Sequence, residues 1–215
     1  MSTAPAIETV FLDIGGVLLT DGWEHQSRRR AARRFDLEWS EMEARHRLVF
    51  EPFEEGKLTL DEYLDLVVFH EKRSFSRSAF RRFMFAQSQA HPEMIALVAR
   101  LKEQHRLKIV VVSNEARELN AHRIRQFGLG ALTDAFISSC FVHVRKPDAD
   151  IFRLALDIAQ TRPERVLYVD NTPMIIQIGA GLGIRGLVHT DYLSTCAKLA
   201  ALGLQTEDGS ANAPR

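Results

Sequence analysis

The sequence predicts an α/β protein whose parallel sheet is interrupted by a block of helices. Past residue 90, short β-branched runs alternate with amphipathic helices, which is the pattern of a parallel sheet with crossover helices. Residues 20–88 read instead as consecutive helices with no strand between them. A length of 215 residues with 46% hydrophobic content is enough for one large domain, or for a core with a smaller inserted one.

Short apolar segments bounded by polar residues are the predicted strands of the sheet. In chain order they are IETVFLD, LKIVVVSN, DAFISS, RVLYVDN and IRGLVHT, about five strands in all, an ordinary size for a sheet. The segments predicted as helices between them repeat apolar residues at helical spacing; they are HPEMIALVARLKEQH, DADIFRLALDIAQ and PMIIQIGAGLG. Pro92 stands at a first-turn position of the first of these helices.

The inserted block is predicted to contain four helices, namely EHQSRRRAARRF, SEMEARHRLVF, TLDEYLDLVVFH and SRSAFRRFMFAQ. The third has a clear start signal, because Thr59 is a favourable N-cap and Glu62 follows three residues later. We therefore expect two parts: a Rossmann-like α/β core formed by residues 1–19 and 89–215, and a four-helix cap formed by residues 20–88.

Composition limits the classes of partner. Twenty-eight Lys and Arg residues balance 28 Asp and Glu residues, so no overall field would attract nucleic acid or an anionic membrane. The basic run RRRAARR is followed by acidic residues, which favours a solvated helix face over a nucleic-acid site. No apolar run approaches 18 residues, and the two distant cysteines, Cys140 and Cys196, fit reduced thiols. We expect a cytoplasmic monomer or homodimer with a small-molecule partner.

Ligands of open parallel sheets bind beyond the carboxyl ends of the strands. Polar side chains stand at these predicted ends: Asp13, Ser113 with Asn114, Lys146 after the third strand, and Asp170 with Asn171. Carboxylates, a hydroxyl, an amide and a lysine at one sheet edge suit an anionic substrate with a cation between the carboxylates, as in phosphoryl transfer. Asp13 is then the predicted nucleophile.

Four segments resemble, in order and spacing, the four motifs of the haloacid dehalogenase-like (HAD) hydrolases. They are FLDIGGVLLTDG, VVVSN, RKPDADIF and LYVDNTPMIIQIGAGLG. The resemblance covers residues 7–190, and the helical insertion after the first motif resembles the type 1 cap of that family. Within the family the sequence looks closest to small sugar-phosphate phosphatases.

The resemblance implies a mechanism in which Asp13 attacks phosphorus and forms an aspartyl-phosphate, while Ser113 and Lys146 hold the phosphoryl oxygens. Gly16 and Asn114 are the implied substrate-binding residues, and the implied substrate is a small phosphorylated metabolite. The implied cofactor is Mg²⁺, with these ligands: Asp13, the carbonyl of Gly15, Asp170 and Asn171.

Two positions depart from the family pattern. The residue two places after the nucleophile is usually an aspartate that protonates the leaving group, and here it is Gly15. Counting back from Gly183 places Asn171 at the usual metal-ligand position, where an amide brings no charge. General acid–base help is worth roughly a hundred- to ten-thousand-fold, so substrates with good leaving groups remain available. These are sugar-1-phosphates, acyl phosphates and aryl phosphates.

Other interpretations of the same residues remain open. Asp21 and His25 are candidates to replace the missing acid, although a helix cap and a polar surface group are the simpler expectations for them. The Ser113-Asn114 pair could cap the following helix, and Lys146 could be a solvated loop lysine. The two departures also leave room for a 2-haloacid dehalogenase acting through an Asp13 ester, or for a non-catalytic binding protein built on the same scaffold.

Overall fold

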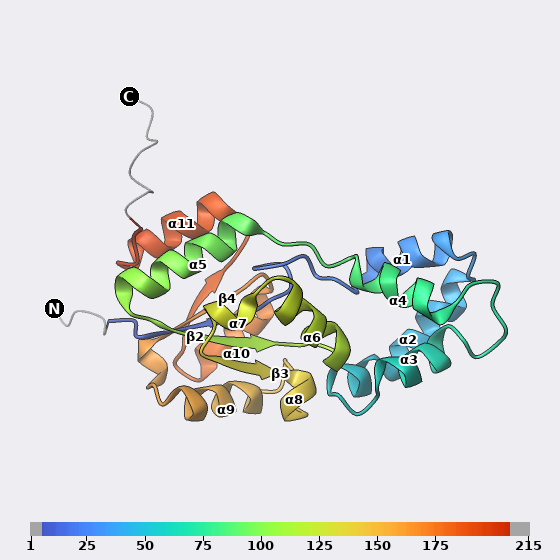
Figure 1. The fold of residues 1–215 in the computed structure, drawn as a ribbon. Helices are drawn as coiled ribbons and strands as arrows, with labels where there is room; N and C mark the ends of the chain where they lie inside the picture. Colours follow the sequence, from blue (N-terminus) through green and yellow to red (C-terminus); the bar gives the residue numbers. More distant parts are fainter. Residues whose placement is uncertain (1–5, 207–215) are drawn as a thin grey trace.

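The computed structural model describes residues 6–206, and its centre is a five-stranded parallel sheet (Figure 1). The strands are β1 (Thr9–Leu12), β2 (Lys108–Ser113), β3 (Ala135–Ser138), β4 (Val166–Asp170) and β5 (Arg185–Val188). Their order across the sheet is β3-β2-β1-β4-β5, and every neighbouring pair is parallel. The sheet and the helices inserted after β1 confirm the predicted fold class.

Both faces of the sheet are covered by helices. Alternate side chains of β1 point to opposite faces, so Val10 and Leu12 join one apolar cluster and Phe11 joins another. The first cluster contains residues of α5 (Pro92–His105) and α11 (Tyr192–Ala201), and the second contains residues of α9 (Asp150–Ala159) and α10 (Pro173–Gly181). Burial on both faces explains why the central strands are continuous apolar runs and not alternating ones.

Four short or peripheral elements complete the core. They are α6 (Arg117–Gln126), α7 (Leu129–Leu132), α8 (Ser139–Val142) and the 3₁₀ turn η1 (Pro163–Arg165). The helix α8 follows β3 directly, and the loop after it leads back toward the carboxyl edge of the sheet. This loop carries Lys146.

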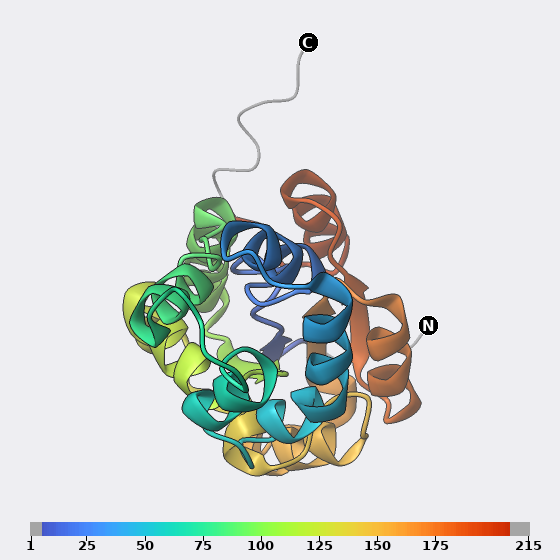
Figure 2. The ribbon, with the colours of Figure 1, turned by 90° about the vertical axis from the view of Figure 1, so that its right-hand side faces the viewer.

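The insertion contains the four predicted helices, α1 (His25–Arg34), α2 (Trp39–Glu54), α3 (Leu60–Val67) and α4 (Arg77–Phe85). They lie together at one end of the molecule, beyond the carboxyl ends of the strands (Figures 1 and 2). Their apolar side chains form a third cluster around Tyr63, Phe80 and Met84, which Ala116 and Leu119 of the core also join. The Thr59–Glu62 capping box is present at the start of α3, as predicted.

Helix α2 is longer than the sequence pattern predicts. We expected it to end at Phe50, but it continues through Pro52 to Glu54. A proline is tolerated there because its missing N–H removes only one bond near the end of the helix. The extra turn matters for the site, because it brings Glu54 against the loop that carries Lys146.

Two chain connections join the insertion to the core, and they run side by side. Thr20 N donates to Gln89 O at 2.9 Å, and His91 N donates to Leu18 O at 2.9 Å. This pairing lies at the proposed boundary between residues 1–19 and 89–215 and residues 20–88. The division into core and cap remains our proposal, and the paired connections support it.

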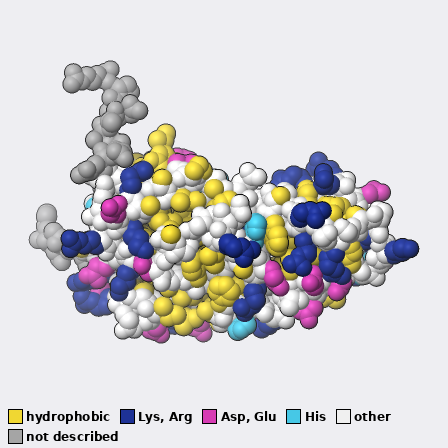
Figure 3. All heavy atoms as spheres, in the orientation of Figure 1, with side chains coloured by type: hydrophobic (Ala, Val, Ile, Leu, Met, Phe, Trp, Pro, Cys, Tyr) yellow, Lys and Arg dark blue, Asp and Glu magenta, His cyan; other side chains and the backbone are white. Residues whose placement is uncertain are grey.

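Charged side chains of both signs share the surface of the molecule. On the face shown in Figure 3, Lys and Arg side chains are interspersed with Asp and Glu side chains. No helix among residues 6–206 is long and apolar enough to cross a membrane. Cys140 and Cys196 are free thiols.

Candidate active site

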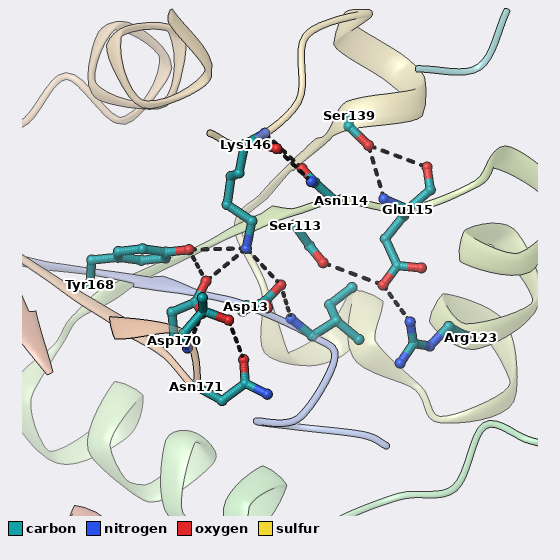
Figure 4. A network of polar contacts seen from close by, with 12 residues as sticks. Asp13, Ser113, Asn114, Glu115, Arg123, Ser139, Lys146, Tyr168, Asp170 and Asn171 are labelled. Carbon is teal, nitrogen blue, oxygen red and sulfur yellow. Dashed lines mark hydrogen bonds and ion pairs between the residues drawn. The ribbon is translucent and has the colours of Figure 1, made fainter. Parts of the chain in front are cut away.

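Three predicted site residues meet where the central strands end. Asp13 follows β1, Ser113 ends β2 and Asp170 ends β4, and β1 lies between the other two strands. The register places Leu12 beside both Val111 and Val169, and Asp13 N donates to Val169 O at 3.0 Å. The topology therefore brings the Asp13 carboxylate next to the Asp170 carboxylate (Figure 4).

Lys146 links the two carboxylates. Its Nζ lies 3.1 Å from Asp13 Oδ1 and 2.7 Å from Asp170 Oδ2. The backbone of Lys146 is fixed by Asn114, whose Nδ2 donates to Lys146 O at 2.8 Å and whose Oδ1 accepts from Lys146 N at 2.8 Å. With a side chain only 5% exposed, Lys146 is a structural and electrostatic centre of the site. The solvated loop lysine considered above is wrong.

Burial and charge act against each other in this cluster. Burial alone would lower the pKa of the Lys146 ammonium, but Asp13 and Asp170 raise it above its ordinary value, so the side chain stays charged. Burial raises the pKa of Asp13, while the Lys146 ammonium opposes that rise. Tyr168 is the third partner: its hydroxyl lies 3.1 Å from Lys146 Nζ and donates to Asp170 Oδ2. Burial keeps the pKa of Tyr168 well above its ordinary value, so it remains a neutral donor.

Ser113 and Asn114 are not helix caps. The N-cap of α6 is Ala116, and it makes no side-chain cap bond. Ser113 Oγ instead donates to Glu115 Oε1 at 3.3 Å, and a hydrogen bond with Ser113 counters the rise in the Asp13 pKa. Asn114 holds the Lys146 loop. The capping alternative for this pair is therefore wrong, and both residues stay at the predicted site.

A buried ion pair lies behind Ser113. Arg123 Nη1 is 2.5 Å from Glu115 Oε1, and both side chains are almost completely buried. Arg123 Nη2 also donates to Thr20 O, at the connection into the insertion. The pair therefore ties the end of β2 to the start of the inserted helices.

The space beside Gly15 is filled by another carboxylate. A Cβ built on Gly15 would lie 3.2 Å from Asp21 Oδ1, so Asp21 reaches the place where a side chain at position 15 would begin. Asp21 does not cap α1, because the N-cap is Glu24; the capping expectation was wrong. Partial desolvation raises the pKa of Asp21 even though the residue as a whole is exposed, and the Arg123 guanidinium opposes the rise. His25 is exposed and packs edge-on against Trp39, as expected of a surface group.

Of the two glycines that follow Asp13, Gly16 is the one with a conformational constraint. Its φ is +67°, and a Cβ there would lie 1.9 Å from Asn171 Nδ2. A glycine is therefore required for the Asn171 amide to approach the first loop. Gly15 is not in the left-handed region. The assignment of Gly16 to substrate binding remains a prediction.

The oxygen atoms at this edge fit a magnesium ion only in part. Both oxygens of Asp170 are engaged, Oδ2 by Lys146 and Oδ1 by Thr172 N at 2.7 Å. Asp13 Oδ1 accepts from Ile14 N and Asn171 Oδ1 accepts from Thr172 Oγ1 at 3.2 Å, so Asp13, the Gly15 carbonyl and Asn171 are less fully engaged than Asp170, and Asn171 lines the same cavity as Asp13. Among the described residues no group of three or more His, Cys, Asp or Glu could hold a metal ion. One carboxylate together with neutral oxygens suits Mg²⁺, because this ion keeps several of its waters when it binds. The ligand oxygens therefore fit a weakly held magnesium ion.

A cavity of about 720 Å³ lies between the sheet edge and the insertion, a usual size for a small-molecule site. The core side of the cavity contains most of the predicted site residues: Asp13, Gly15, Ser113, Asn114, Lys146 and Asn171. Asp21 also lines it. The opposite side is formed by α1, α2 and the segment before them. A ligand placed here would contact Asp13 at one end and the inserted helices at the other.

A buried lysine between two carboxylates, at the carboxyl edge of a parallel sheet and under inserted helices, defines a class of hydrolase. The chain belongs to the haloacid dehalogenase-like hydrolases, because the model of that family matches residues 7–183. The resemblance inferred from the four motifs is thus confirmed.

Individual relatives are distant. A phosphorylated carbohydrates phosphatase of Thermotoga maritima is 22% identical over 188 residues, which are 86% of this chain and 87% of that protein. A HAD family enzyme from Bacteroides thetaiotaomicron has a similar fold, with a TM-score of 0.75 and 17% identity over 86% of this chain and 95% of that chain. That enzyme has also been solved in complex with magnesium and inorganic phosphate. An L-2-haloacid dehalogenase matches with a TM-score of 0.66 and 15% identity over 91% of this chain and 100% of that chain. At these identities the solved structures show the fold alone.

Proposed function

We propose that this protein is a magnesium-dependent phosphatase that hydrolyses a small phosphomonoester through an aspartyl-phosphate on Asp13. The observation that carries the proposal is the Lys146 ammonium, which is buried, faces a cavity and lies 3.1 Å from Asp13 Oδ1. A fixed cation beside a carboxylate nucleophile suits an anionic substrate, and the doubly charged phosphoryl group gains more from it than a singly charged acid does. The phosphatase name of the Thermotoga relative supports the same reaction.

In the proposed first step, Asp13 attacks phosphorus and the bond to the leaving-group oxygen breaks. Oδ1 of Asp13 already accepts from Ile14 N at 2.9 Å and pairs with Lys146, which leaves Oδ2 for attack. Lys146 and Ser113 hold the phosphoryl oxygens. In the second step, water attacks the aspartyl-phosphate, releasing inorganic phosphate and restoring the Asp13 carboxylate.

Magnesium, when bound, neutralises charge on the phosphoryl oxygens. Asp13, the carbonyl of Gly15 and the Asn171 amide would hold it. The Asp170 carboxylate, assigned as a ligand from the sequence, is better placed to orient Lys146. We expect the affinity for magnesium to be low, because Asn171 contributes no charge.

The proton for the leaving group must come from a residue other than Gly15, which has no side chain to donate it. Asp21 is the better of the two candidates, because its carboxyl lies beside Gly15 and lines the cavity, whereas His25 packs on Trp39. Good leaving groups depend least on such a donor. We therefore propose sugar-1-phosphates, acyl phosphates or aryl phosphates as the substrate class, and a cytoplasmic monomer or homodimer as the setting.

A panel of phosphomonoesters assayed with Mg²⁺ and with chelator tests the metal, the reaction and the leaving group together. Aryl and anomeric phosphates are expected to be hydrolysed with Mg²⁺, and hydrolysis is expected to stop with EDTA and return when Mg²⁺ is restored. The 2-haloacids are expected to release no halide. Halide release that chelator does not change would favour a dehalogenase, and a protein that turns over nothing would favour the binding-protein alternative.

Gly15→Asp tests whether position 15 is a vacated acid–base site. The variant is expected to hydrolyse alkyl phosphates about ten-fold faster and to leave aryl phosphates nearly unchanged, because alkoxides need a proton most. The backbone at Gly15 permits the change, but the new Cβ would lie 3.2 Å from Asp21 Oδ1, so Asp21 must shift by a few tenths of an ångström. Initial rates on matched alkyl and aryl phosphates measure the effect.

Two further variants make this result interpretable. Asp21→Asn alone is expected to slow alkyl phosphates more than aryl phosphates, if Asp21 now supplies the proton. A thermal melt of Gly15→Asp detects damage to the fold. Equal gains on both substrate classes would show a general repair of folding or metal affinity, and no gain from a folded variant would direct attention to Asp21 and then to His25.

A further inference from the structure

The side of the cavity opposite Asp13 carries a histidine whose hydrogen atoms can be located by elimination. His46 lies in α2, is 9% exposed and lines the cavity. Its Nδ1 is 2.9 Å from the hydroxyl of Tyr63, and that hydroxyl is 2.9 Å from Trp23 Nε1. Three side chains from separate parts of the insertion thus form one hydrogen-bonded chain.

The direction of each bond follows from the donors available. The indole N–H of Trp23 can only donate, so the Tyr63 oxygen accepts from it. Tyr63 is completely buried, and within the described part of the chain its hydroxyl has no acceptor other than His46 Nδ1. If Nδ1 carried a hydrogen, the hydroxyl proton would be buried without a partner, which is costly. Nδ1 is therefore the acceptor, and the hydrogen of the neutral ring lies on Nε2.

The surrounding groups keep this ring neutral. Burial, followed by the charge of Arg28, lowers the pKa of His46 to about 4, while Glu43 opposes the shift and Arg47 adds to it. Glu43 is itself held by Arg28, with Arg28 Nε at 2.9 Å from Glu43 Oε2. The His46 ring is consequently neutral at physiological pH, and it donates a hydrogen bond only through Nε2.

The Nε2–H group has no acceptor among residues 6–206, although its ring lines the cavity. Aromatic side chains lie around this hydrogen-bonded chain. The ring centroids of Phe50 and His46 are 5.6 Å apart, and those of Phe53 and Tyr63, which stack, are 4.1 Å apart. Trp23, Phe50 and Phe53 also line the cavity. This part of the wall offers aromatic faces to a ring and one fixed neutral hydrogen-bond donor, beside the charged side chains of Arg28, Glu43 and Arg47, which also line the cavity.

We propose that His46 Nε2–H is a specificity-determining donor that binds a hydroxyl or ring oxygen of the substrate's leaving group. The inference rests on the proposed phosphatase function, because Asp13 defines where the phosphoryl end lies. It narrows the substrate class to phosphomonoesters whose leaving group is a ring that carries oxygen. Simple alkyl or cycloalkyl phosphates would leave the donor unpaired.

The tautomer can be measured without any activity. In protein labelled with ¹⁵N-histidine, long-range ¹H–¹⁵N spectra at pH 7 are expected to show an unprotonated Nδ1 and a protonated Nε2 for His46. The signal is assigned by its loss in His46→Gln. Tyr63→Phe removes the donor to Nδ1 and is expected to shift the Nδ1 resonance. A protonated Nδ1 in the wild-type protein would overturn the inference.

Binding tests the recognition itself. In the Asp13→Asn background, which should not turn over, calorimetry compares glucose 1-phosphate with cyclohexyl phosphate, two ring phosphates that differ in their oxygens. We expect tighter binding of the sugar phosphate, a preference reduced about five- to ten-fold by His46→Phe and largely restored by His46→Gln, which keeps an N–H donor. His105→Phe, on α5 away from the cavity lining, is the matched control and should not change the preference.

The outcomes separate this inference from the proposed function. A His46-dependent preference in a protein that hydrolyses nothing would support the donor site and reject the phosphatase. Hydrolysis with a preference that His46→Phe does not alter would support the phosphatase and reject the role of His46. If the sugar phosphate is bound no better than cyclohexyl phosphate, the proposed role of His46 is likewise wrong.

Discussion

Asp13→Asn is expected to remove turnover of every phosphomonoester while leaving the protein folded. An amide is a poor nucleophile, so the loss should be on the order of a thousand-fold or more. The substitution keeps an oxygen that can accept from Ile14 N at 2.9 Å and adds no bulk. Lys146 also keeps its contact of 2.7 Å with Asp170. The fold should therefore survive the change, which makes the loss of activity a chemical result.

Three measurements make this prediction decisive. Rates on an aryl phosphate give the loss of activity, and a thermal melt confirms that the variant is folded. Mass spectrometry of acid-quenched wild-type protein should find a phosphoryl group on Asp13, and the variant should lack it. Asp148→Asn, an exposed aspartate two residues after Lys146, serves as the matched control. Residual activity near that of the wild type would exclude the aspartyl-phosphate mechanism.

The core of the site was predictable because strand ends are visible in a sequence. Asp13, Ser113 and Asp170 each close an apolar run, and parallel strands place their carboxyl ends at one edge. The four helices of the insertion were also visible, since their apolar periodicity and the Thr59 capping box are local signals. The order of the strands was not predicted, because it depends on contacts between distant segments.

Other parts of the site carry no local signal. Tyr168 is one of several apolar residues in β4, and nothing in its neighbourhood along the chain indicates that its hydroxyl meets Lys146. The Glu115–Arg123 pair could be read as ordinary helix charges, yet both side chains are buried. Asp21 was expected to cap a helix because it precedes α1 closely. Only the turn at Gly15 and Gly16 shows that its carboxyl points to the cavity.

Lys146→Met is expected to reduce both the rate of hydrolysis and the stability of the fold. The loss of stability could not be expected from the sequence, in which Lys146 reads as a loop residue. Loss of a charge-assisted contact with the phosphoryl group costs roughly 2–3 kcal/mol of transition-state stabilisation, which is about thirty- to one-hundred-and-fifty-fold in rate. In addition, Asp13 and Asp170 lose the ammonium that lies 3.1 and 2.7 Å from them. Breaking a buried ion pair in this way costs about 3–5 kcal/mol. Urea unfolding at pH 7.5 measures this loss, and a rate equal to that of the wild type would contradict the proposed role of Lys146.

The pH dependence distinguishes a lost charge from lost packing. In the wild-type protein the pKa of Lys146 is raised by the carboxylates, so its contribution to stability is complete below its ordinary pKa of about 10.4 and is lost as pH rises through the folded value. In Lys146→Met, Asp13 faces the Asp170 charge without the ammonium that opposes the rise of its pKa, so the pKa of the Asp13 carboxyl in the folded state should rise further above its value in the unfolded chain. The folded variant then binds more protons than the unfolded one, so its deficit in stability should shrink as pH falls from 7.5 toward 5.

The double variant Lys146→Met/Asp13→Asn removes one of the two charges and should recover part of the loss at pH 7.5. A deficit that is the same at both pH values, and is not relieved by Asp13→Asn, would mean that Lys146 stabilises the protein through its methylene chain and not through its charge.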